Sequence, residues 1–190
     1  MRELGLDRQA KGLDVPMAVN DEASPEQVPE LARGETRRFR RIAALMNYVA
    51  QDWPDTQVVV SHLRGDMSRP TQRSWAMFKI MGRYSKKHQR LRFEYGEQDS
   101  KEGQELRVYS AAFGPGAGIR KSRSGGMILM SGGLIRSWSN RQGSVALSSD
   151  EAEYYVVVKA CAEALGAQAL VRDLGWDLMV KLHADGSARK

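Results

Sequence analysis

Three acidic residues stand within four positions where a strand-like run gives way to a helix-like run, in the segment SSDEAEYY at 148–155. Ser148, followed by Glu151 three positions later, fits a capping box and predicts that a helix begins here. Asp150 and Glu151 then lie in the first turn, where the helix dipole favours negative charge. Glu153 lies past that turn and on a different face from Glu151. It is therefore the candidate for a catalytic or metal-binding carboxylate.

A second carboxylate follows a strand-like run near the end of the chain, where Asp185 comes directly after residues 178–184. A strand-end carboxylate beside a helix carboxylate is a common way to hold a divalent cation. Glu153 and Asp185 are therefore the candidate catalytic and metal-binding residues. The residue pattern leaves the ordinary interpretation open, in which Glu153 is a solvated glutamate on a helix surface.

The composition favours an intracellular protein with a polyanionic partner. The net charge is +6, and the basic residues cluster at 33–41, 83–92 and 120–123, which is typical of nucleic-acid binding. The single cysteine, Cys161, excludes an intrachain disulfide and indicates a reducing compartment, cytoplasmic or nuclear. No apolar run reaches the length of a membrane span, so we expect no membrane partner.

The elements that must position these residues fall into two halves. Residues 1–34 are polar and rich in proline, which predicts a poorly ordered linker, and the charged, glycine-containing stretch at 96–104 predicts a second one. Between them, 35–95 shows helical spacing of apolar residues over 35–51, 55–67 and 71–88. The last part, 105–190, predicts strands at 106–113, 126–130, 134–139 and 178–184, with a hairpin turn around Gly132-Gly133. It also predicts a helix over 149–165 that ends at Gly166, with a further helical segment before Gly175.

Four motifs carry a resemblance to a known family. They are FRRIAALMNYVAQDWPDTQVVVSHLRGDMSRPTQRSWAMFKIMGRY at 39–84, IRKSRSGG at 119–126, IRSWSNRQGSVALSSDEAEYYVVVKACAEALG at 135–166 and LHADGSA at 182–188. Through these motifs nearly the whole chain resembles the C-terminal part of the Pol polyprotein of copia-type retrotransposons. In that family the end of the reverse transcriptase region is followed by a ribonuclease H domain.

The resemblance implies an α/β fold, with an incomplete ribonuclease H-like mixed sheet and a flanking helix over 105–190. The helical tail of the reverse transcriptase region precedes it over 35–95. The family domain hydrolyses the RNA of RNA–DNA hybrids with two Mg²⁺ ions held by acidic residues. Its helix glutamate falls on Glu153 and its strand-end aspartate on Asp185. We expect phosphate contacts, to a hybrid or to another nucleic acid, from the basic residues around that site: Arg120, Lys121, Arg123, Arg136 and Arg141.

The chain departs from the family where the first metal ligand belongs. The family strand reads S-D-x-D-W-A, whereas residues 110–115 here read SAAFGP, so neither aspartate is kept. The nearest upstream carboxylate, Glu105, lies roughly 15 Å along the same strand at about 3.3 Å per residue, too far to substitute. The family's fourth ligand lies downstream of the motif at 182–188, past Lys190. We therefore expect a truncated domain without hydrolytic activity and with doubtful Mg²⁺ binding.

Two alternatives stay open beside this prediction. One is a nucleic-acid-binding module that keeps a basic surface without the chemistry. The other is an active nuclease that uses a different first ligand.

Overall fold

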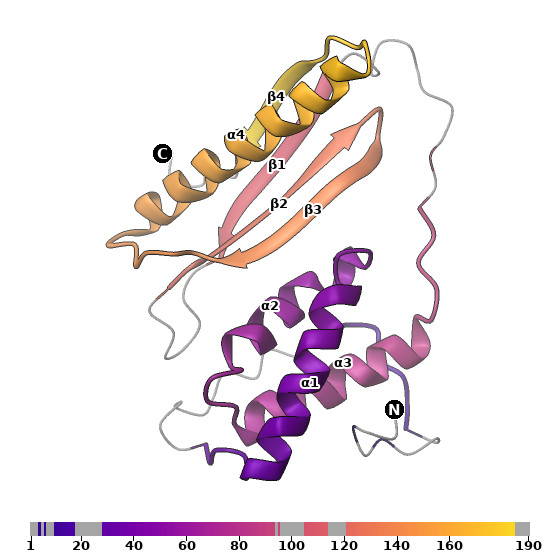
Figure 1. The fold of residues 1–190 in the computed structure, drawn as a ribbon, viewed down its shortest axis with the longest axis vertical. Helices are drawn as coiled ribbons and strands as arrows, with labels where there is room; N and C mark the ends of the chain where they lie inside the picture. Colours follow the sequence, from indigo (N-terminus) through magenta and orange to yellow (C-terminus); the bar gives the residue numbers. More distant parts are fainter. Residues whose placement is uncertain are drawn as a thin grey trace. The chain divides into compact units, whose positions relative to one another are not determined.

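The chain has an α/β architecture in two compact units, Met1–Leu91 and Arg92–Lys190 (Figure 1). The computed structural model describes residues 4, 6, 10–17, 28–93, 95, 105–113 and 121–184. Each unit has its own hydrophobic core. The linker predicted at 96–104 lies outside the described residues, a few positions past the division between the units.

The first unit is helical. Its helices are α1 (Arg33–Val49), the 3-10 helix η3 (Pro54–Thr56), α2 (Gln57–Gly65) and α3 (Gln72–Lys87), close to the three predicted ranges. Thr71 begins α3, because its hydroxyl oxygen accepts a hydrogen bond from the Ser74 N–H at 3.3 Å. In the core, the rings of Phe39 and Phe78 meet edge to face with centroids 4.7 Å apart. Aromatic burial therefore holds α1 against α3.

Described residues before α1 belong to this core rather than to a solvated linker. Leu4 and Leu31 are buried with the apolar side chains of the helices. The Lys86 ammonium donates a hydrogen bond to the Ala10 carbonyl at 2.9 Å. The region 1–34, predicted to be poorly ordered, is thus attached to the first unit at these points.

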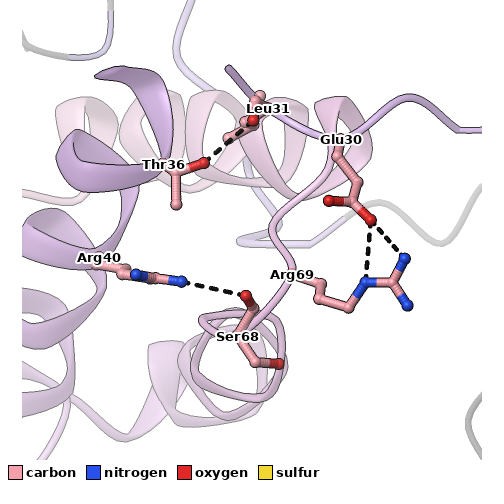
Figure 2. A network of polar contacts seen from close by, with 6 residues as sticks. All are labelled: Glu30, Leu31, Thr36, Arg40, Ser68 and Arg69. Carbon is pink, nitrogen blue, oxygen red and sulfur yellow. Dashed lines mark hydrogen bonds and ion pairs between the residues drawn. The ribbon is translucent and has the colours of Figure 1, made fainter. Parts of the chain in front are cut away.

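Arginine side chains fasten the connection between α2 and α3 (Figure 2). The Arg40 guanidinium on α1 donates a hydrogen bond to the Met67 carbonyl at 2.7 Å. It also donates to the Ser68 carbonyl at 3.1 Å. Arg69 donates to one carboxylate oxygen of Glu30 from both Nε at 2.9 Å and Nη2 at 2.5 Å. Arg40 is therefore exposed and still fastens the connection between α2 and α3.

The second unit is a mixed sheet with a helix on one face. Its strands are β1 (Glu105–Phe113), β2 (Arg123–Met130), β3 (Gly133–Arg141) and β4 (Met179–Ala184), in the order β3-β2-β1-β4. β1, β2 and β3 are antiparallel neighbours, whereas β4 runs parallel to β1. The helix α4 (Ser149–Asp173) lies across the sheet (Figure 1). Leu106, Val108 and Ile128 are buried beneath Ala160 and Ala164 of that helix.

The turn between β2 and β3 explains why these strands pair in one register. Ser131 has φ 51° and Gly132 has φ 77°, as a two-residue type I′ turn requires. Met130 and Gly133 close the hairpin as register partners. The predicted hairpin is present, one residue earlier than the Gly132-Gly133 pair.

The helix α4 does not end at Gly166, so that prediction is wrong. It continues to Asp173, and Gly175, with φ +91°, lies just past its end in the left-handed conformation that glycine favours. Ala167 and Val171 pack against the core of the second unit. This burial after Gly166 offsets the cost of a glycine inside a helix, about 1 kcal/mol relative to alanine.

By length and composition alone, α4 could cross a membrane, although the sequence had predicted no run of that kind. Core helices of water-soluble proteins meet the same criterion. One side of α4, formed by Ala152, Val156, Ala160 and Ala164, is buried in the second unit. Most of α4 is nevertheless uncovered, since 17% of its apolar window is buried.

Candidate functional site

The start of α4 has the predicted N-cap and holds Asp150 and Glu151 in its first turn, but the reciprocal bond of the predicted capping box is not formed. The Ser148 hydroxyl accepts a hydrogen bond from the Glu151 N–H at 3.1 Å, which confirms the N-cap. The Glu151 carboxylate accepts from the Leu147 N–H at 2.6 Å and from the Tyr155 hydroxyl at 2.7 Å, rather than from the cap residue itself. These two bonds lower the pKa of Glu151, and the Glu151 carboxylate raises the pKa of Tyr155.

Glu153 reaches the sheet at the end of β1. Its Oε2 accepts a hydrogen bond from the Ala112 N–H at 3.3 Å. In the parallel pair, Ser110 of β1 is the register partner of Ala184, the last residue of β4. The helix carboxylate and the ends of two strands therefore come together. Asp185, the predicted second ligand, lies outside the described residues.

The end of β1 supplies no carboxylate to this place, because its last four residues are Ser110, Ala111, Ala112 and Phe113. Glu105 begins the same strand at its other end, and its carboxylate accepts a hydrogen bond from Arg107 Nε at 2.6 Å. That bond lowers the pKa of Glu105. Within the described ranges, no three His, Cys, Asp or Glu side chains lie close enough to hold a metal ion.

Gln142 positions the start of α4 on the sheet, and sequence reasoning missed it. It is buried, and its Nε2 donates hydrogen bonds to the Ala152 carbonyl at 2.9 Å and to the Ser124 hydroxyl at 3.2 Å. Its backbone N–H donates to the Ser122 carbonyl at 2.9 Å. The residue thus links β2 to the helix turn that carries Glu153. Its only sequence signal is its place between a strand end and a helix start.

The predicted phosphate-contacting residues do not form one exposed cluster in the described structure. Arg123 is 3% exposed, so its guanidinium does not reach the surface. Arg141, its register partner on β3, is exposed. Arg136 turns toward α4, where its Nη2 lies 3.2 Å from the Glu163 carboxylate.

The other two basic residues of that set precede β2. The Lys121 ammonium donates a hydrogen bond to the Gly143 carbonyl, so it fastens the loop after β3. Arg120 lies outside the described residues. Of the four that the structure describes, Arg136 and Arg141 are exposed, and Arg136 already pairs with Glu163, so Arg141 suits a phosphate group best.

The site thus consists of Glu153, the amide of Ala112, the buried amide of Gln142 and the ends of β1 and β4. In this arrangement the Glu153 carboxylate of α4 is held at the end of β1 by a hydrogen bond from the Ala112 N–H. The chain matches no protein-family model, no curated protein and no solved structure at a significant level.

Proposed function

We propose that this chain is the end of the reverse transcriptase region and a ribonuclease H-like domain of a copia-type Pol polyprotein whose hydrolytic reaction has been lost. One observation carries the proposal. The Glu153 carboxylate lies against the Ala112 N–H at the end of β1, where the family's strand aspartates fall on Ala111 and Phe113. On this proposal Glu153 is the helix ligand that remains, and the strand ligand is gone.

The chemistry explains why this loss ends the reaction. Two-metal hydrolysis needs carboxylates that bridge and neutralise two divalent cations about 3.5–4 Å apart. With the aspartates of β1 replaced, the first metal ligand is missing, and Glu153 and Asp185 by themselves offset only half the charge of two Mg²⁺ ions. Mg²⁺ also requires near-octahedral oxygen coordination, which apolar side chains cannot supply. The residues present therefore do not fit the metal pair.

A hydrolysis assay tests the proposal. Purified protein is incubated with an RNA–DNA hybrid in Mg²⁺ and, separately, in Mn²⁺, and the cleaved RNA is resolved on a gel. We expect no cleavage above the buffer control from the wild type, from Glu153→Gln or from Glu163→Gln. The last is a matched control, because Glu163 lies on the same helix and pairs with Arg136 instead of the strand end. Cleavage that Glu153→Gln abolishes and Glu163→Gln retains would refute the loss of activity.

A second candidate function is nucleic-acid binding without chemistry. The observation that favours it is a group of exposed arginines on α1: Arg37, Arg38 and Arg41. Arg38 holds its guanidinium 5.7 Å from the ring centroid of Trp75, which fixes one charge at the surface of the first unit. Arginines at this spacing share one side of a helix and suit phosphate contacts.

Salt dependence tests this second candidate. Affinity for a fluorescent hybrid duplex should fall steeply as salt rises, because each phosphate contact releases condensed counterions. The double variant Arg37→Gln/Arg41→Gln should flatten the slope, whereas Arg69→Gln, whose arginine pairs with Glu30, should leave it unchanged. A wild-type affinity that does not respond to salt excludes the idea.

A further inference from the structure

The side of α4 that faces away from the sheet is apolar and exposed. Tyr154 is 65% exposed, Val158 49% and Leu165 63%, and Cys161 between them is exposed as well. If α4 were in the interior of the unit, these four side chains would be covered. In the described structure they are exposed to solvent. An exposed apolar patch on a folded unit marks a protein or membrane interaction surface.

These residues form a continuous stripe with coiled-coil spacing. The outer stripe, as we call it, consists of Asp150, Tyr154, Val158, Cys161, Leu165 and Arg172. Steps of three and four residues lead from Asp150 to Leu165, and a step of seven, or two helical turns, leads to Arg172. These residues share one side of the helix, opposite the buried side that contains Val156 and Ala160. The two charged residues between Tyr154 and Leu165, Lys159 and Glu163, lie outside the stripe and are half-buried.

The stripe is apolar from Tyr154 to Leu165, and its two ends have opposite charge. Between Leu165 and Arg172 the same spacing falls on Gln168, which is half-buried and donates a hydrogen bond to the Leu178 carbonyl at 2.7 Å. Asp150 stands at one end and Arg172 at the other, both exposed, and Cys161 lies midway between them in the sequence. When two copies of the helix pack antiparallel about a two-fold axis at Cys161, each Asp150 lies level with the partner's Arg172. Parallel packing would instead bring like charges together. The charge pattern is therefore complementary to itself in one orientation.

We propose that the outer stripe of α4 is the interface of a symmetric antiparallel homodimer whose two-fold axis passes near Cys161. The contact is isologous, since the same residues contribute from both copies. Val158 of each copy packs against the partner's Leu165, and antiparallel alignment also opposes the two helix dipoles favourably. The proposal concerns assembly and does not depend on the function proposed above.

Small exposed residues beside the stripe, Ala162 and Ala169, let two helix backbones approach closely. Stable interfaces bury on the order of 1,200 Å² or more for the pair, so a dimer needs the end residues of the stripe as well as its apolar ones. Arg172 already lies 3.3 Å from Asp177, and both are exposed, so the end charges set orientation more than affinity.

A lipid surface fits this stripe less well. Helices that lie on membranes carry lysine and arginine along the polar border of their apolar side. Here the helix begins with Asp150 and Glu151, which an anionic membrane repels. The occupant that the charges favour is therefore a second copy of the chain.

Sedimentation equilibrium on the full 190-residue chain tests the proposal. We expect a dimer for the wild type and at least a tenfold weaker association for Leu165→Glu. Ile135→Glu is the matched control, because Ile135 on β3 is 50% exposed and lies outside the stripe, and it should stay dimeric. Circular dichroism establishes that each variant is folded before its mass is interpreted.

Charge reversal tests the orientation. Arg172→Asp should weaken the dimer, and the double variant Asp150→Arg/Arg172→Asp should restore it, because acid and base again meet at each end. A short bismaleimide should link two wild-type copies through Cys161 and fail with Cys161→Ser. A double variant as weak as the single one would refute the antiparallel arrangement.

Three results would overturn the interface itself. The first is a wild type that sediments as a monomer at its highest soluble concentration. The second is a dimer that Leu165→Glu leaves intact. The third is flotation of the wild type, but not Leu165→Glu, with vesicles of phosphatidylcholine and phosphatidylserine, which would assign the stripe to a membrane.

Discussion

The indole ring of Trp138 lies against the backbone of Gly126, its register partner on the neighbouring strand. A Cβ at Gly126 would stand 2.2 Å from the ring atom Cζ2 of Trp138 and 2.7 Å from Cε2. The buried indole fills the space that a side chain would need. The absence of a side chain at position 126 is thus what allows β3 to place its tryptophan under α4.

Gly126→Ala should therefore destabilise the second unit, by about 1–3 kcal/mol, because the added methyl forces a buried ring from its position. Urea denaturation followed by tryptophan fluorescence measures the change. Gly143→Ala serves as the control, since nothing lies within 4 Å of a Cβ there. Equal midpoints for the two variants would contradict the packing described.

Gly166→Ala should have the opposite effect. The residue lies inside α4, and nothing stands within 4 Å of the place that an alanine Cβ would take, so alanine should stabilise the helix by about 0.5–1 kcal/mol. The midpoint of urea unfolding is compared with the wild type at a concentration where the chain is monomeric. A loss of stability would show that the helix is interrupted at Gly166 in solution.

Tyr84→Phe should cost the first unit about 1 kcal/mol, because the tyrosine hydroxyl donates a 2.8 Å hydrogen bond to the Asp55 carboxylate. Burial, followed by the Asp55 carboxylate, raises the pKa of Tyr84 to about 12. Tyrosine in the unfolded chain titrates near 10. The folded state therefore holds this proton more tightly, and the contribution is complete below about pH 10 and is lost as the pH rises toward about 12.

Thermal unfolding and an ultraviolet titration measure the two parts of that prediction. The variant should lose the tyrosinate absorbance that appears near pH 12 in the wild type. Tyr48→Phe is the control for stability, because Tyr48 is exposed on α1. A wild-type titration complete near pH 10 would contradict the hydrogen bond.

Glu151→Gln should lower the melting temperature at neutral pH, since the ionised carboxylate accepts from the Leu147 N–H and the Tyr155 hydroxyl. The pKa of Glu151 is held below its ordinary value in the folded state. Its stabilising effect is therefore present above the unfolded pKa and disappears as the pH falls through the folded one. Melting curves of wild type and variant should converge in acid; a difference independent of pH would count against this role.

Much of the local fold could be predicted because the signals were short-range. Ser148 and Glu151 marked the start of α4, and the glycines after Met130 marked the hairpin. The prediction that α4 ends at Gly166 was wrong, because the burial of Ala167 and Val171 beyond it offsets the cost of a glycine inside a helix. Parallel pairing of β1 with β4 joins residues far apart in the sequence, and no local pattern specifies such a partner.

The residues of the candidate site also differ in whether the sequence could predict them. Glu153 could be selected in advance, since its position relative to the helix start follows from the cap. Gln142 could not, because its two hydrogen bonds depend on how α4 lies on the sheet. Arg123 looked like a phosphate contact within a basic run, yet it lies in a buried strand segment. Charge along a sequence does not by itself say which side chains reach solvent.

The position of β4 has a consequence for the order of folding. β1, β2 and β3 can pair through connections that are short in sequence, whereas β4 can join β1 only after the chain has passed through the whole of α4. Because non-local pairing must offset a larger loss of chain entropy, we expect β4 to dock last. Until it does, β1 presents an open edge, and Glu153 meets the amide of Ala112 on a strand that still lacks one neighbour.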